Sequence, residues 1–142
     1  MLTNVKMEVN DMTASTTGPG ITRLGQIQIR TADVERAADF YEKVLGLKLI
    51  FKAPPGLAFF DCNGVRLMLD RPEKPEFDHA SSILYFAVPD IQAAHASLKA
   101  QGVRFADEPH MIARMPDHDL WMNFFHDTED NMLALMSEVK RS

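Results

Sequence analysis

The densest group of side chains capable of chemistry lies in residues 108–121, E-P-H-M-I-A-R-M-P-D-H-D-L-W. Asp117 or Asp119 could orient His118 as a general base, because a carboxylate on one ring nitrogen leaves the other free to take a proton. His110 and His118 with a carboxylate could instead form a metal site of unusual composition. The alternative without a function is a solvated loop capped by Pro116 and Asp117. We predict one long connection here, with His118, His110 and Asp117 as candidate catalytic residues.

Four further side chains of reactive type are expected to have ordinary roles. His79 and His126 are predicted in turns, and His95 on a helix, partly exposed. Cys62 is the single cysteine, so an intrachain disulfide is impossible and the fold does not depend on an oxidising compartment. A reactive thiolate needs a neighbouring His or Lys, and the sequence places none beside Cys62, so a buried thiol is expected.

Composition excludes several classes of function. The 142 residues suit one domain, and a chain of that length buries roughly 68–70% of its unfolded surface, so it needs no disulfide or structural metal. A net charge of −5 argues against broad nucleic-acid binding. No apolar run reaches the roughly 18–20 residues of a membrane span, and residues 1–20 lack the apolar centre of a secretion signal. We predict a cytoplasmic protein with no nucleic-acid or membrane partner, and a disordered polar tail over residues 1–20.

Local patterns predict an α+β chain. Residues 26–30 alternate polar and apolar side chains, as a half-buried strand does. Asp33 can cap a helix that Gly46 ends, and Asn63-Gly64 is a strong hairpin signal. The predicted elements are a strand at 21–30, a helix at 34–45, strands at 48–51, 57–61 and 65–70, a strand at 83–88, a helix from 91 that Gly102 ends, and strands at 103–105, 121–126 and 132–136.

The second half of the chain repeats the first. The matched segments are Asp33 with Asp90, Phe59-Phe60 with Phe124-Phe125, and Leu67-Met68-Leu69 with Leu133-Ala134-Leu135. We therefore divide one domain, residues 21–142, into module one (21–70), a linker (71–80) and module two (81–138). Each repeat unit has an apolar sheet face that it cannot cover alone. We expect a helix on one face of each sheet, and the other two faces to curl into a shared concave wall.

Three motifs carry a resemblance to a known family. They are Gln26-Ile27-Gln28-Ile29, Phe40-Tyr41 before Leu45-Gly46-Leu47, and Phe124-Phe125-His126-Asp127 before Asn131. With the repeat, they make residues 21–138 similar to the glyoxalase/bleomycin-resistance/dioxygenase superfamily, also called the vicinal oxygen chelate superfamily. The resemblance implies two βαβββ modules that form an open, U-shaped barrel around a cavity, and a homodimer.

The same resemblance identifies four inward positions that carry His, Gln or Glu in metal-binding members. By position they fall on Gln26, Met68, Ile83 and Ala134, of which only Gln26 has a side-chain oxygen. A divalent cation needs several ligands, usually anionic or imidazole ones. The resemblance therefore predicts no metal ion and no cofactor here, and it removes metal-dependent dioxygenase, glyoxalase and epimerase chemistry.

Strand alternation sorts the remaining side chains between the helix-covered faces and the cavity. We expect under the helices Ile27, Ile29, Leu67, Leu69, Leu84, Phe86, Leu133 and Leu135. The cavity wall then contains Gln26, Gln28, Arg30, Met68, Ile83, Tyr85, Met132, Ala134 and Met136. That wall is mostly apolar with a few polar groups, as small-molecule pockets are; the alternative is that its methionines fill a tight core. The predicted ligand-binding residues are Gln26, Gln28, Arg30, Met68, Ile83, Tyr85, Arg114, Trp121 and Ala134.

Two functions follow from these observations, and a third is weaker. The first is metal-independent binding of a small organic molecule, on a scaffold similar to bleomycin-resistance proteins. The second is a glyoxalase-like lyase or isomerase that uses His110 and His118. The third is a partner domain whose pocket has no ligand.

Overall fold

The computed structural model describes residues 18–54 and 56–141, so the predicted tail lies almost wholly outside the described residues. Module one contains β1 (Gln26–Arg30), α2 (Val34–Asp39), the π-helical turn η2 (Phe40–Val44), β2 (Lys48–Ala53), β3 (Leu57–Cys62) and β4 (Val65–Asp70). The linker includes the 3₁₀ turn η3 (Pro75–Phe77). Module two contains β5 (Leu84–Ala87), α3 (Ile91–Ala100), β6 (Arg104–Phe105), β7 (His110–Arg114), β8 (His118–His126) and β9 (Met132–Lys140).

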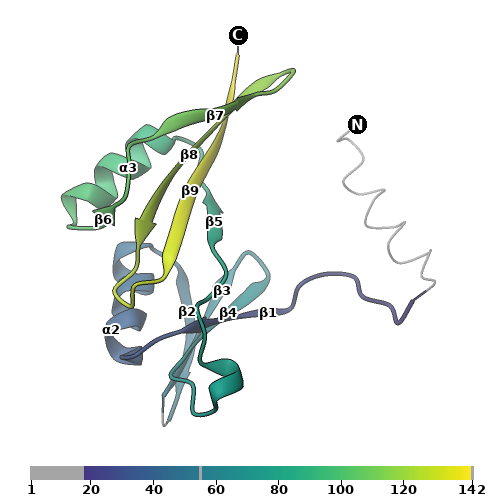
Figure 1. The fold of residues 1–142 in the computed structure, drawn as a ribbon, viewed down its shortest axis with the longest axis vertical. Helices are drawn as coiled ribbons and strands as arrows, with labels where there is room; N and C mark the ends of the chain where they lie inside the picture. Colours follow the sequence, from purple (N-terminus) through teal and green to yellow (C-terminus); the bar gives the residue numbers. More distant parts are fainter. Residues whose placement is uncertain (1–17, 55, 142) are drawn as a thin grey trace.

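These strands form two sheets. Sheet A has the order β1-β4-β3-β2, and sheet B has the order β5-β9-β8-β6, with β7 also paired to β8. The first strand of each module runs parallel to the last, while the other pairs are antiparallel. Figure 1 shows sheet A in the lower part and sheet B in the upper part, with α2 and α3 on the same side of the molecule. The predicted α+β fold of two βαβββ modules is confirmed.

The predicted repeat extends to the register of the strands. Met68 lies opposite Gln28 and Phe59, just as Ala134 lies opposite Tyr85 and Phe124. A one-residue slip would turn every side chain to the other face, so equal register means that equivalent residues share equivalent faces. The two halves therefore offer the same positions with different side chains.

The helix ends follow from the capping residues that the sequence indicates. Asp33 Oδ1 accepts from the backbone N–H of Arg36 at 3.0 Å, and Asp90 Oδ1 accepts from that of Ala93 at 3.1 Å. Gly46 has a φ of 77° just after the first helix, where residues with a Cβ are disfavoured. Among the described residues, no helix has the length and apolar character needed to cross a bilayer.

The first helix differs from the prediction in its last turns. An α-helix was expected over 34–45, but the chain widens into the π-helical turn η2 after Asp39. Phe40 and Tyr41, adjacent in sequence, are both buried there. The apolar residues at 34, 37, 38, 41 and 45 keep α-helical spacing, so the sequence pattern gives no sign of the wider turn.

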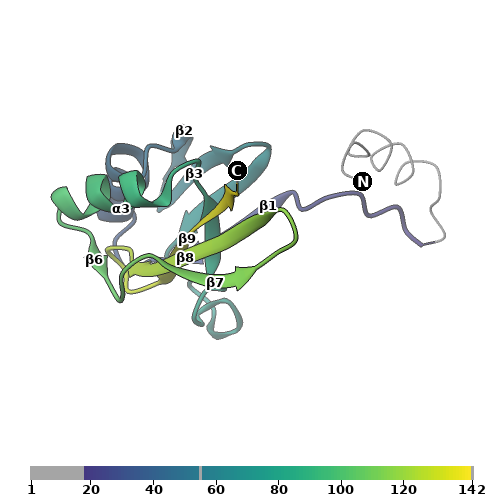
Figure 2. The ribbon, with the colours of Figure 1, turned by 90° about the horizontal axis from the view of Figure 1, so that it is seen from above.

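The core lies under the two helices, where the sheets meet them. Figure 2 shows α3 along one side of the long β8–β9 pair. All eight residues expected under the helices are in the apolar core or pack against it, so that part of the face prediction is confirmed. They are Ile27, Ile29, Leu67, Leu69, Leu84, Phe86, Leu133 and Leu135.

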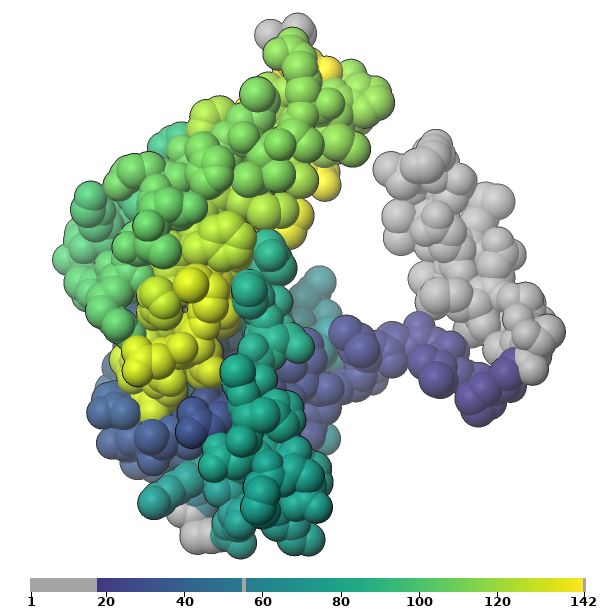
Figure 3. Space-filling model, viewed as in Figure 1, coloured from purple at the N-terminus to yellow at the C-terminus, as the bar shows by residue number. Residues whose placement is uncertain are grey.

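Four sequence predictions on module two and the first strand are wrong. One concerns His126, which was expected in a turn but is the last residue of β8, paired with Met132 and Arg104. Residues 108–121 do not form one long connection: β7 and the start of β8 make a hairpin, closed by Met115 N–H donating to the His118 carbonyl at 2.8 Å. This green hairpin projects at the top of the molecule in Figure 3. The clustered charges concealed the strands, because exposed strands tolerate polar side chains. The first strand begins at Gln26 and not at residue 21, since its pairing with β4 starts at Gln26 opposite Arg66, and β4 itself begins only at Val65.

His95 is also misplaced by the sequence prediction, because it is buried and only 6% exposed. Its Nδ1 lies 2.9 Å from Asn123 Nδ2, and its ring centroid lies 4.2 Å from that of Phe105. Its Nε2 lies 3.3 Å from Glu108 Oε1. The strands β6 and β8 cover this face of α3, which helical spacing alone did not indicate.

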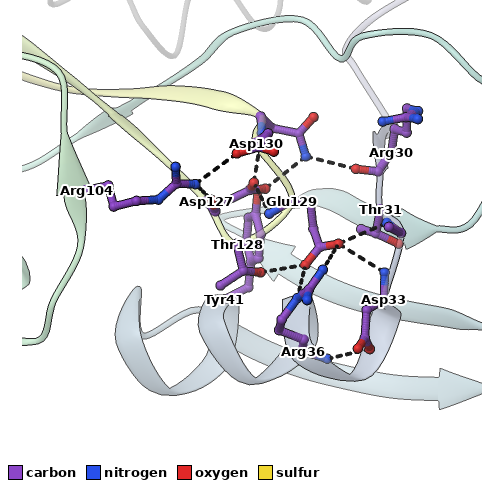
Figure 4. Close-up of polar contacts among 12 residues, drawn as sticks. Arg30, Thr31, Asp33, Arg36, Tyr41, Arg104, Asp127, Thr128, Glu129 and Asp130 are labelled. Carbon is purple, nitrogen blue, oxygen red and sulfur yellow. Dashed lines mark hydrogen bonds and ion pairs between the residues drawn. The ribbon is translucent and has the colours of Figure 1, made fainter.

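A buried polar network joins the modules at the turn between β8 and β9 (Figure 4). Tyr41 Oη donates to Asp127 Oδ2 at 2.8 Å, and Asp127 Oδ1 accepts the backbone N–H groups of Glu129 and Asn131 at 2.7 and 2.9 Å. The amide of Asn131 donates to Asp127 Oδ2 at 2.9 Å and to the Arg30 carbonyl at 2.8 Å. Burial, reinforced by the charge of Asp127, raises the pKa of Tyr41 well above its usual value, so its hydroxyl remains a donor.

Glu129 forms the second half of this junction. Its carboxylate accepts from Arg36 Nε at 2.8 Å, from Thr128 Oγ1 at 2.7 Å, and from the backbone N–H groups of Ala32 and Asp33 at 2.9 and 3.0 Å. Burial alone would raise the pKa of Glu129, but these hydrogen bonds dominate and lower it to about 2. We call the contacts of Asp127 and Glu129 together the module junction.

Candidate functional site

The open face of sheet A, turned away from α2, carries a row of side chains across its four strands. Phe51 of β2 stacks on Phe59 of β3 with ring centroids 4.6 Å apart. The guanidinium carbon of Arg66, on β4, lies 5.3 Å from the Phe59 centroid. Arg66 Nε donates to Gln26 Oε1 of β1 at 2.8 Å, which completes the row. We call Phe51, Phe59, Arg66 and Gln26 the sheet A row.

Polar pairs flank this row. Gln28 donates to Asp70 Oδ2 at 3.0 Å. Burial raises the pKa of Asp70, and the hydrogen bond from Gln28 partly offsets that effect. Arg30 forms an ion pair with Asp78 of the linker. Gln26, Gln28, Arg30 and Met68 share one face, and Gln26, Gln28 and Arg30 each have at least one polar atom bonded within the protein.

Sequence reasoning missed three members of the sheet A row. Arg66 alternates with Met68 along β4, so the same period-two argument that selected Met68 applies to it. Phe59 lies opposite Met68, but only the register reveals this, and Phe51 follows a register shift in β2 that no sequence pattern indicates. The alternation of side chains along β4 could thus have identified Arg66, whereas no sequence pattern could have identified Phe51.

The open face of sheet B is more apolar. Ile83 and Tyr85 are about half exposed, and the Tyr85 ring meets that of Phe124 edge to face, with centroids 5.8 Å apart. Ala134 lies opposite both aromatic residues and is fully buried. Tyr85 also borders a recess of about 510 Å³ that lies beside α3 rather than on the open face, and Val44, Cys62 and Leu98 line it with Tyr85. A volume of that size suits a small organic molecule.

Cys62, at the edge of this recess, is partly buried. Burial, reinforced by the neighbouring charge of Asp61, raises the pKa of the Cys62 thiol. A raised pKa disfavours the thiolate that would act as a nucleophile. Cys62 therefore contributes packing rather than reactivity.

The four positions that hold metal in the similar family do not fit a cation in this chain. Met68, Ile83 and Ala134 supply one thioether and two hydrocarbon side chains. The only oxygen, that of Gln26, already accepts from the positively charged Arg66, and a guanidinium beside it repels a second cation. Within residues 18–54 and 56–141, no cluster of three or more His, Cys, Asp and Glu side chains could hold a metal ion.

The structure pairs His118 with Asp117, one of the two carboxylates considered for it. His118 Nδ1 lies 2.8 Å from Asp117 Oδ1, and this hydrogen bond lowers the pKa of Asp117. Asp119 instead pairs with Arg141. His118 lies opposite Lys140, six residues beyond Ala134 on β9, which is roughly 20 Å at about 3.4 Å per residue. The pair is thus distant from the inner positions of the sheet.

The other candidates on the hairpin are not brought to this pair. His110 lies opposite Met122, four residues from His118 along β8, or roughly 14 Å. The two histidines therefore do not converge on one ion within the chain. Trp121 alternates with Asn123 on the helix-covered face of β8 and packs against the core, and Arg114 lies opposite Asp119 on that same side. Neither residue shares the open face with Tyr85.

Comparison with solved structures places this geometry among known folds. A member of the glyoxalase/bleomycin resistance protein/dioxygenase superfamily from Sphaerobacter thermophilus is 23% identical, with a TM-score of 0.70, over 83% of this chain and 98% of that one. A lactoylglutathione lyase from Agrobacterium tumefaciens is 18% identical, with a TM-score of 0.66, over 82% and 94%. TnmS3, an antibiotic binding protein from a Streptomyces species, is 22% identical, with a TM-score of 0.66, over 83% and 97%.

These identities establish a shared fold. A search of curated proteins found no match. The sequence profile of the Glyoxalase/Bleomycin resistance protein/Dioxygenase superfamily matches residues 23–135, most of the chain. The protein therefore belongs to the Glyoxalase/Bleomycin resistance protein/Dioxygenase superfamily.

Proposed function

We propose that the protein binds a small organic molecule, without a metal ion, on the open faces of its two sheets. The observation that carries this proposal is the state of Gln26: the one oxygen at the four inward positions is hydrogen-bonded to Arg66. Met68, Ile83 and Ala134 leave no anionic or imidazole ligand beside it. The Streptomyces antibiotic binding protein has a similar fold, which is consistent with a binding role for this scaffold.

The side chains on these faces suit an organic ligand of mixed character. Burying about 300 Å² of apolar ligand surface at about 25 cal/mol/Å² contributes roughly 7 kcal/mol. Association costs at least about 4 kcal/mol of that gain. Apolar contact alone therefore gives weak binding, and useful affinity requires oriented polar groups or stacking. Gln26, Arg30, Tyr85 and Trp121 were predicted for this role. Trp121 lies on the helix-covered face of β8, and the sheet A row adds Arg66 and two phenylalanines.

The test is binding of a panel of small aromatic compounds to the full chain, measured by native mass spectrometry with and without EDTA. We expect saturable one-to-one binding that EDTA leaves unchanged. A stoichiometric metal ion in the purified protein, or binding that EDTA abolishes, would overturn metal independence. The proposal includes a homodimer, which light scattering after gel filtration tests, and a cytoplasmic location, which cell fractionation tests.

The His118–Asp117 pair supports a second candidate, a glyoxalase-like lyase or isomerase. A carboxylate 2.8 Å from Nδ1 orients the imidazole so that Nε2 can exchange a proton with a substrate. Turnover of α-hydroxythioesters and related lyase substrates by the wild type, His118→Ala and His79→Ala tests this. Activity lost only in His118→Ala would favour the enzyme, whereas no turnover by the wild type would reject it.

A further inference from the structure

Arg66 is a cation without a carboxylate partner among the described residues. Among the described arginines, Arg30, Arg36, Arg104 and Arg141 each form an ion pair, and Arg23, Arg71, Arg114 and Arg66 form none. The side chain of Arg66 bonds to the neutral amide of Gln26. Asp61 lies opposite it on β3, but Asp61 Oδ1 accepts from the backbone N–H of Gly64 at 3.1 Å. The charge of Arg66 is therefore available to a molecule from outside the chain.

The sheet A row holds this charge in a fixed place. The guanidinium carbon lies 5.3 Å from the centroid of Phe59, which Phe51 supports by stacking. Arg66 Nε donates a hydrogen bond to Gln26 Oε1 at 2.8 Å. With Nε bonded to Gln26 and the guanidinium carbon held near the Phe59 ring, the two terminal nitrogens remain free to form a fork that matches a carboxylate. A fixed fork loses little entropy when an anion binds.

From this geometry we infer that the ligand is a flat aromatic molecule with one carboxylate, which Arg66 binds through its terminal nitrogens. The inference rests on the proposed function and adds the class of ligand to it. Phe51 is 46% exposed, so its ring can stack on the aromatic part while Met68 supplies a polarisable contact. The carboxylates of Asp61 and Asp70 share this face, and their repulsion favours one negative charge over the two of a phosphate.

The probes are 2-naphthoate and its neutral analogue 2-naphthamide, which share the ring system and differ in charge. Binding of each to the full chain is measured by calorimetry at pH 7 and low salt. We expect 2-naphthoate to bind at least about tenfold more tightly, because hydrogen bonds to charged groups are the stronger ones. This preference should shrink as salt is added.

Variants locate the preference. Arg66→Gln should weaken 2-naphthoate binding at least about tenfold and leave 2-naphthamide binding unchanged. Arg66→Lys keeps the charge without the fork and should retain part of the preference. Arg71→Gln is the matched control, because Arg71 is exposed and borders a recess beside the start of α2 rather than the sheet A row. Equal thermal unfolding of the variants would exclude a folding defect.

The outcomes separate this inference from the proposed function. Equal affinity for the two probes, or loss of the preference in Arg71→Gln but not in Arg66→Gln, would overturn the inference and leave small-molecule binding intact. Failure of both probes and of the whole aromatic panel to bind would overturn the proposed function with it.

Discussion

The module junction and the sheet A row each place an arginine beside a hydrogen-bond acceptor, but the acceptor is a carboxylate in the first and a neutral amide in the second. At the junction, Arg36 meets the buried carboxylate of Glu129, which further accepts hydrogen bonds from Thr128 and two backbone N–H groups. In the row, Arg66 meets only the neutral Gln26 on an exposed sheet face. Polar groups that satisfy one another hold the fold together, whereas a cation left with one neutral partner is suited to an outside molecule.

This comparison predicts a division of labour between the two regions. Substitutions at the junction should reduce stability and leave the binding chemistry of correctly folded protein alone. Substitutions in the row should reduce binding and leave stability almost unchanged. The following substitutions are ordered by the expected size of their effect.

Asp127→Ala should have the largest effect on stability. It leaves the Tyr41 hydroxyl, the Asn131 amide and two backbone N–H groups without their buried acceptor. Orphaned buried donors cost about 1–3 kcal/mol each, partly relieved by relaxation, so we expect about 3–5 kcal/mol less free energy of unfolding in urea.

Asp130→Asn is the matched control for this substitution. Asp130 lies in the same turn but is exposed, and its side chain bonds only to Arg104 among the described residues. Asparagine tolerates the φ of 63° at this position. A surface pair contributes little, so the change should stay within about 0.5 kcal/mol. Equal losses in the two variants would contradict a special role for the junction.

Acid should weaken the junction through Glu129. Its folded pKa, about 2, lies below the ordinary value of 4.5, so the stabilisation is complete above about pH 4.5 and disappears as the pH falls toward 2. At 1.36 kcal/mol per pKa unit, the loss is about 3 kcal/mol. The free energy of unfolding in urea, measured at pH 6 and at pH 2.5, should fall less in Glu129→Gln than in the wild type, by about that amount. Glu42→Gln, which removes an exposed carboxylate, is the control. If the stability of Glu129→Gln depended on pH as strongly as that of Glu42→Gln, Glu129 would not be the source of the acid sensitivity.

The fold and the site differed in how far the sequence predicted them. The alternation of polar and apolar residues, the helix-capping residues and the internal repeat predicted both modules. Alternation and caps are local signals, and the repeat corresponds to strands that pair in equivalent registers in the two modules. The junction was not predicted, although Tyr41, Asp127 and Glu129 are visible in the sequence, because they meet across more than 80 residues. Only tertiary packing brings such residues together.

The candidate site was predicted by position rather than by contact. Parity along β1 and β4 placed Gln26, Gln28 and Met68 on one face, and the structure shows them there. The hairpin of β7 and β8 was missed because its exposed strands carry charged side chains that suggested a loop. The stacking of Phe51 on Phe59 depends on a register shift, which has no sequence signature.

Tyr41→Phe should have an intermediate effect. The substitution removes one donor to Asp127, while Asn131 still donates to the same oxygen. The ring packing against Phe40 and Phe60 remains. A hydrogen bond to a charged group is worth about 1.5–3 kcal/mol, and the remaining donor places this loss near the lower end. A loss in urea unfolding as large as that of Asp127→Ala would mean that the hydroxyl, and not the carboxylate, organises the junction.

Arg66→Gln should have the smallest effect on stability, which makes it the sharpest contrast with the junction. The side chain is exposed, and the substitution removes one hydrogen bond to Gln26 and one contact with the Phe59 ring. Exposed contacts of a cation with an aromatic ring contribute about 0.5–1 kcal/mol, so the free energy of unfolding should fall by less than about 1 kcal/mol. Urea unfolding without ligand measures this directly. A loss comparable to that of Asp127→Ala would show that Arg66 holds sheet A together, and its charge would then need no ligand to account for it.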